Sequence, residues 1–391
     1  MRGTTMLRLA AVAATLGTCP ALAEKKPEPL PPFSQAYAPT NADERGAWME
    51  ADEFERKLRD SRSVIRDPAL NAYVRGVLCR TVGADRCGAV RIYIQRVPAF
   101  NATMMANGAM TVWSGLLLRV RNEAELGAVL GHEFGHFELR HTLNGFRNRR
   151  GATNLIAWAS ILAPTAGLAL QLDAIGGVFA FDRAQEREAD LIGFRYLADC
   201  PYPSAAAADV WDRLMGETDA TALGRRRKAH QHYTAGFFAT HPTNLERATY
   251  LRSAAVQAAD TDAPAVDGHA AAMAAWLPEF LTDQIKLNDF GGTEYLLAGL
   301  AATPAGWTAP LSFARGELYR ERGNPRDLVS AAQFYREVIA TGHAMPEAHR
   351  GLGLALLRGQ EEAGGRAALA TYLRLKPEAS DAALISTLLS Q

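Results

Sequence analysis

The chain has 391 residues, of which 48% are hydrophobic, so it can fold into two or three domains around real cores. Lys and Arg together number 42, and Asp and Glu together also number 42, which gives a formal net charge of zero. This balance argues against a chain built to bind nucleic acid, and we expect no nucleic-acid partner. Function must therefore be sought in particular sites.

Residues 1–23 are typical of a secretory signal. Two arginines precede a short apolar run that ends in Ala-Leu-Ala at Ala23. The run is too short to span a bilayer, so we expect export and cleavage near Ala23. A lipoprotein signal acylated at Cys19 is the alternative, although Thr18 stands where such signals usually have Gly or Ala. Residues 24–42 are Pro-rich and polar, which predicts a linker.

The remaining cysteines matter because export leads to an oxidising compartment. Cys79 and Cys87 flank a short segment that contains Gly83, which would let their Cα atoms approach. We therefore predict a disulfide between them. Two free thiols are the alternative. Cys200 would be left over, either buried or reactive.

Hydrophobic periodicity predicts the elements of a domain over residues 43–256. Two amphipathic helices should be followed by two strands; the four ranges are 41–60, 67–83, 89–97 and 108–115. A further helix should begin at Asn122 and run to residue 143, with Glu125 completing a capping box. Another helix should begin at Asp182.

Residues 155–172 are almost wholly apolar but contain Pro164 and Gly167. Three interpretations fit this stretch: a membrane span, a buried pair of helices, or an apolar flap over a cleft. Its marginal length and the central proline favour the second and third. We therefore expect a soluble protein, or one in peripheral contact with a membrane, rather than an integral membrane protein.

The C-terminal third, residues 270–391, contains two units that repeat at a spacing of 37 residues. The matched positions are Gly316 and Gly353, Ala331 and Ala368, Tyr335 and Tyr372, and Val338 and Leu375. In each unit a turn interrupts apolar positions at helical spacing, which predicts a helix–turn–helix repeat. The units resemble the tetratricopeptide family, which implies an α-solenoid that binds partners. Residues 257–269 should form a linker, and residues 270–305 should add a helical pair.

The sequence GHEFGH at residues 131–136 places the pattern H-E-x-x-H on a predicted helix. Because residues four apart share one face of a helix, His132 and His136 direct two imidazoles toward one point. Glu133 is placed to contact a water molecule at that point, which suits a general base. Ordinary helix histidines without a metal are the alternative. His141 follows one residue too early for the third histidine of a metzincin, so we expect a packing or supporting role.

A catalytic zinc site needs a third protein ligand and an open position. The helix that begins at Asp182 carries Glu186 and Asp190, which share a face, whereas Glu188 points elsewhere. One of the pair could ligate the metal while the other hydrogen-bonds a ligand imidazole from behind. A surface acidic cluster is the alternative.

Three stretches resemble the BepA, HtpX and Oma-type zinc endopeptidases, gluzincins related to the CAAX prenyl proteases. The stretches are GHEFGH, EREADLIGFRYL and THPTNLER, and the likeness covers roughly residues 45–255. The resemblance implies a mainly α-helical metallopeptidase domain with a small β-sheet. With the signal and the repeats, the chain is most similar to BepA-like members, which act on outer-membrane protein assembly.

The resemblance also implies roles for individual residues. Glu186 becomes the third ligand, beside His132 and His136, of one zinc ion per chain. Asp190 becomes the group that supports a ligand imidazole. The His-Pro motif of the family maps to His241, which is implied to lie over the active site with Arg247 and can occupy the open position of the metal at rest.

The substrate peptide is expected to lie extended, as a strand added beside Asn101 and Ala102. In the family this strand usually reads Asn-Ala-Phe-Ala, but here Thr103 and Met104 take the last two positions. The substrate-binding edge therefore departs from the family pattern.

We expect a periplasmic zinc endopeptidase that serves quality control or assembly of outer-membrane proteins. Its substrates would be proteins or peptides, and its repeats would contact the assembly machinery. Glu133 would act as the base, while His241 and Arg247 would stabilise the developing oxyanion or gate access. The alternative is a chaperone or assembly adaptor that acts mainly through its repeats while the metal site is latched.

Overall fold

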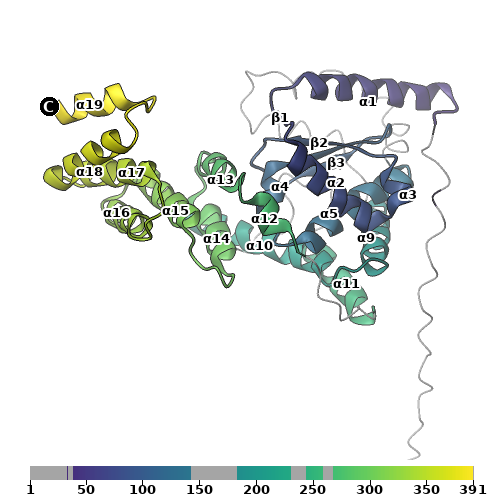
Figure 1. Ribbon diagram of the computed structural model, residues 1–391. Coiled ribbons are helices and arrows are strands. Elements are labelled where there is room, and N and C mark those ends of the chain that lie inside the picture. Colours follow the sequence, from purple (N-terminus) through teal and green to yellow (C-terminus); the bar gives the residue numbers. More distant parts are fainter. Residues whose placement is uncertain (1–32, 34–37, 142–182, 230–243, 259–266, 391) are drawn as a thin grey trace, which may run out of the picture. The chain divides into compact units, whose positions relative to one another are not determined.

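The computed structural model describes residue 33 and residues 38–141, 183–229, 244–258 and 267–390 (Figure 1). The helices of the N-terminal two thirds are α1 (Ala42–Asp60), α2 (Pro68–Val82), α3 (Ala84–Cys87), α4 (Ser114–Arg119), α5 (Glu123–Glu138), α9 (Arg183–Ala198), α10 (Ala206–Gly224) and α11 (Asn244–Gln257). The strands are β1 (Val64–Ile65), β2 (Arg91–Gln95), β3 (Ala102–Met104) and β4 (Ala109–Trp113). The predicted mainly α-helical fold with a small sheet is confirmed.

Helix starts follow the capping residues in the sequence. The side chains that accept a hydrogen bond from a backbone N–H of the first turn are Asn41 in α1, Asp67 in α2 and Asn122 in α5. The Glu125 carboxylate accepts from the backbone N–H of Arg121, 2.8 Å away, one residue before the cap. Helix α5 ends at Glu138, earlier than the predicted end at residue 143.

The strands form one mixed sheet in the order β1-β2-β4-β3. Strands β2 and β4 are parallel, with Ile92 opposite Met110, and the two outer pairs are antiparallel. Within the described part of the chain β3 pairs with β4 alone, so it is an edge strand. Figure 1 shows α1 on one face of the sheet and α2 and α5 on the other. The sheet therefore supports the helix that carries the H-E-x-x-H pattern.

Helix α1 is held on the sheet by an apolar contact and by one buried carboxylate. Phe54 and Leu58 pack against Met105 and Ala109 in the first contact. The buried Glu55 carboxylate makes the other contact. It accepts hydrogen bonds from Arg91 Nε at 2.6 Å, Tyr93 Oη at 2.6 Å and Asn107 Nδ2 at 2.8 Å. The hydrogen bond from Arg91 lowers the pKa of Glu55 to about 2, despite its burial.

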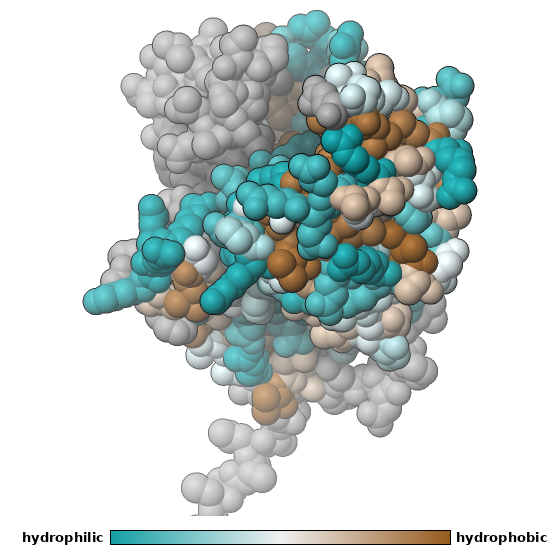
Figure 2. All heavy atoms as spheres, turned by 90° about the vertical axis from the view of Figure 1, so that its left-hand side faces the viewer, coloured by the Kyte–Doolittle hydropathy of each residue, from teal (hydrophilic) through white to brown (hydrophobic). Residues whose placement is uncertain are grey.

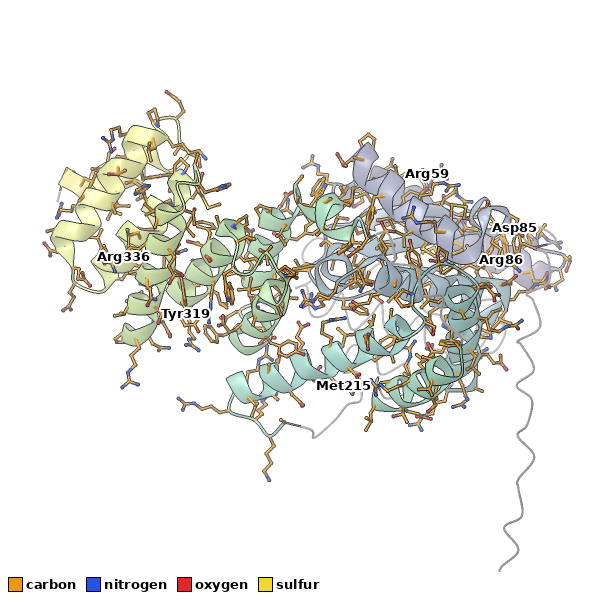
Figure 3. All side chains as sticks on the ribbon, turned by 60° about the horizontal axis from the view of Figure 1, so that its bottom comes forward. Arg59, Asp85, Arg86, Met215, Tyr319 and Arg336 are labelled. Atoms are coloured by element: carbon orange, nitrogen blue, oxygen red, sulfur yellow. A yellow bond between two sulfur atoms is a disulfide. The ribbon has the colours of Figure 1, made fainter. Side chains whose placement is uncertain are left out.

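The predicted disulfide is confirmed, because Cys79 of α2 is bonded to Cys87 of α3, with the Cα atoms 5.0 Å apart. The buried Arg86 of α3 (Figure 3) donates to Glu138, the last residue of α5, at 3.2 Å. The disulfide therefore ties α3 to α2, and the Arg86–Glu138 ion pair holds α3 beside the end of α5. Cys200 is half-buried and not disulfide-bonded, and burial raises the pKa of its thiol to about 11.

The C-terminal helices are α12 (His269–Met273), α13 (Leu277–Ile285), α14 (Phe290–Ala301), α15 (Ala309–Arg322), α16 (Pro325–Ala340), α17 (Pro346–Arg358), α18 (Glu362–Leu375) and α19 (Ala382–Ser390). Helix pairs α15–α16 and α17–α18 match the two predicted units. A Cβ at Gly316 would lie 2.8 Å from the ring of Tyr335, so glycine lets these helices close. Tyr335 and Tyr372 are both buried, but Val338 is buried while Leu375 is 52% exposed. The tetratricopeptide assignment stays a prediction.

The last two helices present apolar side chains at the surface. Leu375 of α18 and Leu384 of α19 are 52% and 63% exposed. Figure 2 views the molecule from this end and shows apolar side chains gathered between polar ones.

Several predicted features lie outside the described residues: the signal at 1–23, the apolar stretch 155–172, and His241 with Pro242. They stay predictions, as do the domain boundaries. Helices α13 and α14 fall in the range where a further helical pair was predicted. Of the helices that the structure describes, none has both the length and the apolar character that a bilayer crossing requires.

We predict that Glu55→Gln destabilises the fold at pH 7 by about 1–3 kcal/mol, since a charged hydrogen-bond acceptor is lost in a buried position. Because the pKa of Glu55 is lowered from 4.5 to about 2 in the folded state, the stability from its ionised form is present above pH 4.5. That stability is lost as the pH falls from 4.5 toward 2, so the variant and the parent should converge there. Urea unfolding across this range measures the difference.

The exposed Glu53, which pairs with Arg56 on the same helix, provides the matched control. Glu53→Gln should change the unfolding midpoint at pH 7 much less than Glu55→Gln does, because an exposed ion pair contributes little to stability. A difference between Glu55→Gln and the parent that stays constant down to pH 2 would contradict the assignment.

Candidate metal centre

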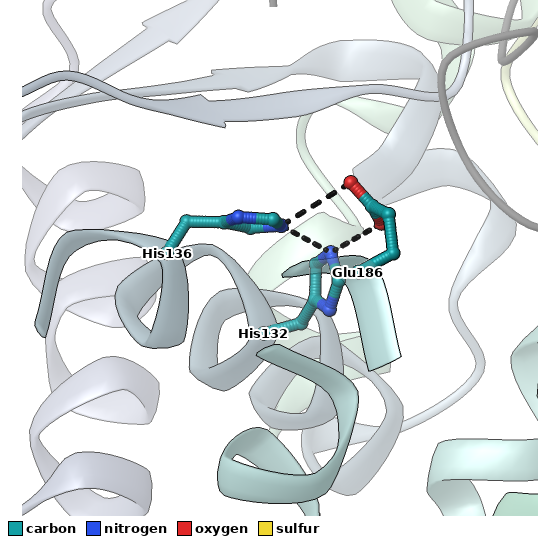
Figure 4. Close-up of side chains that lie close together, drawn as sticks. All are labelled: His132, His136 and Glu186. Atoms are coloured by element: carbon teal, nitrogen blue, oxygen red, sulfur yellow. Dashed lines mark hydrogen bonds and ion pairs between the residues drawn. The ribbon is translucent and has the colours of Figure 1, made fainter. Parts of the chain in front are cut away.

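Helices α5 and α9 direct three ligand side chains toward one point. His132 and His136 extend from the same face of α5, and their Nε2 atoms lie 3.2 Å apart. Glu186, in the first turn of α9, turns its carboxylate toward both rings (Figure 4). The three side chains are buried, with residue exposures of 5%, 1% and 0%. The structure thus brings together the two stretches in which sequence analysis placed the ligands.

Glycines allow α9 to approach α5 so closely. A Cβ on Gly193 of α9 would lie 2.9 Å from the backbone nitrogen of His132. On α5, a Cβ on Gly135 would lie 2.6 Å from the Ile192 side chain and 3.1 Å from the backbone oxygen of Ala189. Contacts this short leave no room for a side chain at either glycine. The distance between the helices, and with it the reach of Glu186, depends on them.

The ligand atoms fit a tetrahedral metal ion. Glu186 Oε2 lies 3.6 Å from His132 Nε2, and Glu186 Oε1 lies 3.5 Å from His136 Nε2. Two ligand atoms bound at about 2.0–2.1 Å in a tetrahedron lie about 3.3–3.4 Å apart. The observed separations of 3.2, 3.5 and 3.6 Å agree with this value. Two imidazole nitrogens and one carboxylate also match the ligand set of catalytic zinc sites.

Asp190 supports His132 from the side away from the ligand point. Its Oδ1 atom lies 2.8 Å from His132 Nδ1. Arg247 Nε donates to Asp190 Oδ2 at 2.8 Å, and the hydroxyl of Tyr250 donates to the same oxygen. Burial alone would raise the pKa of Asp190, but the positive Arg247 and the hydrogen bonds hold it well below its usual range. Asp190 is therefore a carboxylate that can fix the proton of His132 on Nδ1.

Arg247 is the buried cation of this cluster. It is 1% exposed, and its guanidinium lies 3.7 Å from the centre of the Trp211 ring of α10. Its Nη1 atom is 4.0 Å from Glu186 Oε2. Burial opposes its charge, but Asp190 raises the pKa of Arg247 above its usual value, so it stays cationic. Its Nη2 atom lies 3.4 Å from His132 Nε2, so Arg247 borders the ligand point as well as Asp190. The predicted role at the oxyanion or as a gate stays a prediction.

His136 has a different support. Its Nδ1 atom lies 3.0 Å from Nδ1 of His141, and His141 Nε2 lies 3.2 Å from Oε2 of Glu188. His141 is buried, as its predicted packing or supporting role requires, whereas the Glu188 side chain is 64% exposed. Glu188 points away from the ligand point, as the helical spacing predicted, and its carboxylate reaches His141.

Glu133 adjoins the first ligand on α5 and is 9% exposed. Burial raises the pKa of Glu133 to about 7, and the neighbouring Glu186 carboxylate acts in the same direction. A carboxylate with such a pKa can both accept and release a proton near neutral pH, as a general base must.

The predicted substrate edge lies next to the helix that carries the ligands. Asn101 precedes β3 and Ala102 is its first residue, and β3 packs against α5. Sequence reasoning did not identify Tyr250 or Trp211 as parts of the site. Tyr250 lies three residues after Arg247 on α11, so helical spacing could have indicated it. No local signal marks Trp211, because α10 reaches the site only through tertiary packing.

Comparisons with known proteins agree with this geometry. Residues 66–255 match the sequence profile of Peptidase family M48. A Vibrio cholerae protein named provisionally as a beta-barrel assembly-enhancing protease is 29% identical over 51% of this chain and 43% of its own length. The mitochondrial metalloendopeptidase OMA1 of Arabidopsis thaliana is 30% identical over 42% of this chain and 31% of its own length. The metalloprotease YcaL of Escherichia coli is 32% identical over 39% of this chain and 57% of its own length.

These relatives are therefore matched over only part of their length. The chain spans 43% of the Vibrio protein and 31% of the Arabidopsis protein. What the whole relatives do can be carried to this chain only as a proposal.

We predict that Gly193→Ala weakens metal retention and lowers the thermal unfolding temperature. The new Cβ would meet the His132 backbone at 2.9 Å, so α9 must move away from α5 and carry Glu186 with it. Overpacking should cost about 1–3 kcal/mol, more than the roughly 0.5–1 kcal/mol that alanine gains over glycine in a helix. Calorimetry and zinc content after dialysis against a weak chelator measure both effects.

Gly76 of α2 is the matched control. A Cβ there would meet only the end of the Arg80 side chain, at 3.4 Å. Gly76→Ala should keep or raise the unfolding temperature and leave metal content unchanged. Equal metal retention in Gly193→Ala and the parent would refute the close-packing account.

Proposed function

We propose that this chain is a zinc-dependent endopeptidase, because residues 66–255 match the sequence profile of Peptidase family M48. The observation that carries the proposal is the meeting of His132, His136 and Glu186 at one buried point, with Glu133 beside them. Zinc is the favoured ion because two neutral imidazoles and one carboxylate form a typical catalytic zinc set. Hard cations such as Mg²⁺ and Ca²⁺ prefer sites built from oxygen ligands.

In the proposed mechanism, a bound zinc ion supplies Lewis-acid polarisation of the scissile carbonyl and acidifies water. Glu133 would accept the proton of the attacking water at a carboxylate oxygen, because it adjoins the ligand His132 and is buried beside the ligand point. Asp190 keeps the proton of His132 on Nδ1, so that Nε2 can act as a ligand. Arg247 in turn holds Asp190 in place.

The substrate is proposed to be a protein segment in extended conformation. Among the described residues the edge strand β3, with Asn101 before it and Ala102 within it, pairs with β4 alone, and the substrate segment would pair along its other edge. The residues of β3 are buried, so this edge would have to be uncovered first. Strand β3 packs on α5, so a paired segment would run close to the ligand point. Proposed roles for His241 over the metal and for Arg247 at the oxyanion belong to the same scheme.

We further propose that the protease acts in outer-membrane protein assembly or quality control, in the periplasm. Support comes from a relative named for beta-barrel assembly, from the predicted signal over residues 1–23, and from the C-terminal helical hairpins. The exposed Leu375 and Leu384 would belong to a surface for partner proteins. The same surface favours the second candidate, an adaptor that acts through its helices while the metal site is latched.

Glu133→Gln separates the two candidates. Loss of a general base should slow cleavage of an unfolded protein such as casein by about 10²–10⁴-fold, while the metal ligands are untouched. Cleavage rate and zinc content of the purified full chain are measured together. A variant that cleaves as fast as the parent would contradict the assigned base, and a parent that cleaves nothing while the chain still assists assembly would favour the adaptor.

A further inference from the structure

The two ligand histidines are supported from behind by different groups, and both supports end on α9. His132 contacts Asp190 directly. His136 contacts His141, which contacts Glu188. Helix α9 therefore supplies one carboxylate for each ligand histidine: Asp190 for His132 and Glu188 for His136. Asp190 makes direct contact, whereas the His141 ring lies between Glu188 and His136.

The backbone is bent to place this ring. After α5 ends, Leu139 N donates to Gly135 O and Arg140 N donates to Phe137 O, each at 3.0 Å. Arg140 then adopts a left-handed conformation with φ of 57°, which costs a non-glycine residue roughly 1–2 kcal/mol. The turn directs the chain back so that the His141 ring meets His136, with ring centres 5.1 Å apart. Arg226, Asn288 and Gln360 adopt the same conformation just after α10, α13 and α17, so this is a common way for the helices of this chain to end.

If His136 ligates a metal through Nε2, the hydrogen bonds from His136 to His141 and from His141 to Glu188 fix where each ring proton lies. For His136 to ligate through Nε2, that atom must be unprotonated, so the proton of the neutral ring lies on Nδ1. It donates to Nδ1 of His141, whose own proton must then lie on Nε2. That proton is donated to the Glu188 carboxylate, which only accepts. Every nitrogen between the ligand point and Glu188 is thereby assigned.

We propose that His141 and Glu188 are positioning residues, which fix the orientation and tautomer of His136 and so determine how tightly the site holds its metal. The inference rests on the proposed zinc site and adds two residues to it. His141 acts through His136, and Glu188 acts through His141. Outer partners of this kind change metal affinity by about 10–100-fold when they are removed.

The first test replaces the buried ring. In the full chain, His141→Phe keeps an aromatic ring but removes the acceptor, and it should raise the zinc dissociation constant by about 10–100-fold in competition with a chromophoric chelator. His141→Asn can place its side-chain oxygen near the former Nδ1 atom and should recover part of the affinity. The visible spectrum of the cobalt-substituted protein should shift in His141→Phe and return toward the parent in His141→Asn.

The second test uses the exposed end of the chain of contacts, where a folding defect is not expected. Glu188→Ala should raise the zinc dissociation constant at the lower end of the range, by about 10-fold. Asp199→Ala, which removes another exposed carboxylate just after α9, is the matched control and should bind zinc as the parent does.

The outcomes are distinct. Weaker zinc binding in His141→Phe and Glu188→Ala, with the control unchanged, supports the proposal. Parent-like zinc affinity and cobalt spectra in both variants overturn it, even if His141→Phe lowers the unfolding temperature of the metal-free protein, because that result indicates a packing role alone. A parent that holds no zinc overturns the proposed function, and this inference with it.

Discussion

The close contact between α5 and α9 is the constraint on which the site depends. Glu186 reaches the two histidines because Gly135 and Gly193 contribute no side chain of their own to the contact between the helices. The sheet and α2 hold α5 from one side, and the Arg86–Glu138 ion pair holds α3 beside its end. The Cys79–Cys87 bridge ties α3 to α2. Protein interiors are close-packed, so a shift of either helix by a few tenths of an ångström would also move the ligand side chains that it carries.

Charge supplies the second constraint. Glu133, Glu186 and Asp190 are all buried within a short distance of one another, which is costly unless positive charge offsets them. Arg247 is committed to Asp190, and burial leaves Glu133 with a pKa of about 7. A divalent cation at the ligand point would balance Glu186 and the ionised fraction of Glu133. The electrostatics of the cluster therefore favour a metal, in agreement with the spacing of the ligand atoms.

Most features that depend on residues close together in the sequence were predicted correctly. Helical spacing placed His132 and His136 on one face, alternation placed β2 and β4, and cysteine spacing indicated the disulfide. The choice of Glu186 over Asp190 as a ligand needed a family resemblance, since spacing alone treats the two alike. Contacts that depend on tertiary packing could not be predicted from the sequence. Examples are the contact of Trp211 with Arg247 and that of Glu188 with His141. The end of α5 was also misplaced, because no glycine marks the left-handed turn at Arg140.

The proposed function requires that α5 and α9 together hold one zinc ion through His132, His136 and Glu186. The most direct test is elemental analysis of the purified full chain beside Glu186→Ala, after dialysis under identical conditions. We expect one zinc per chain in the parent and a large loss in the variant, with the unfolding temperature of the metal-free forms little changed. Equal zinc in both proteins, or none in a metal-replete parent, would contradict it.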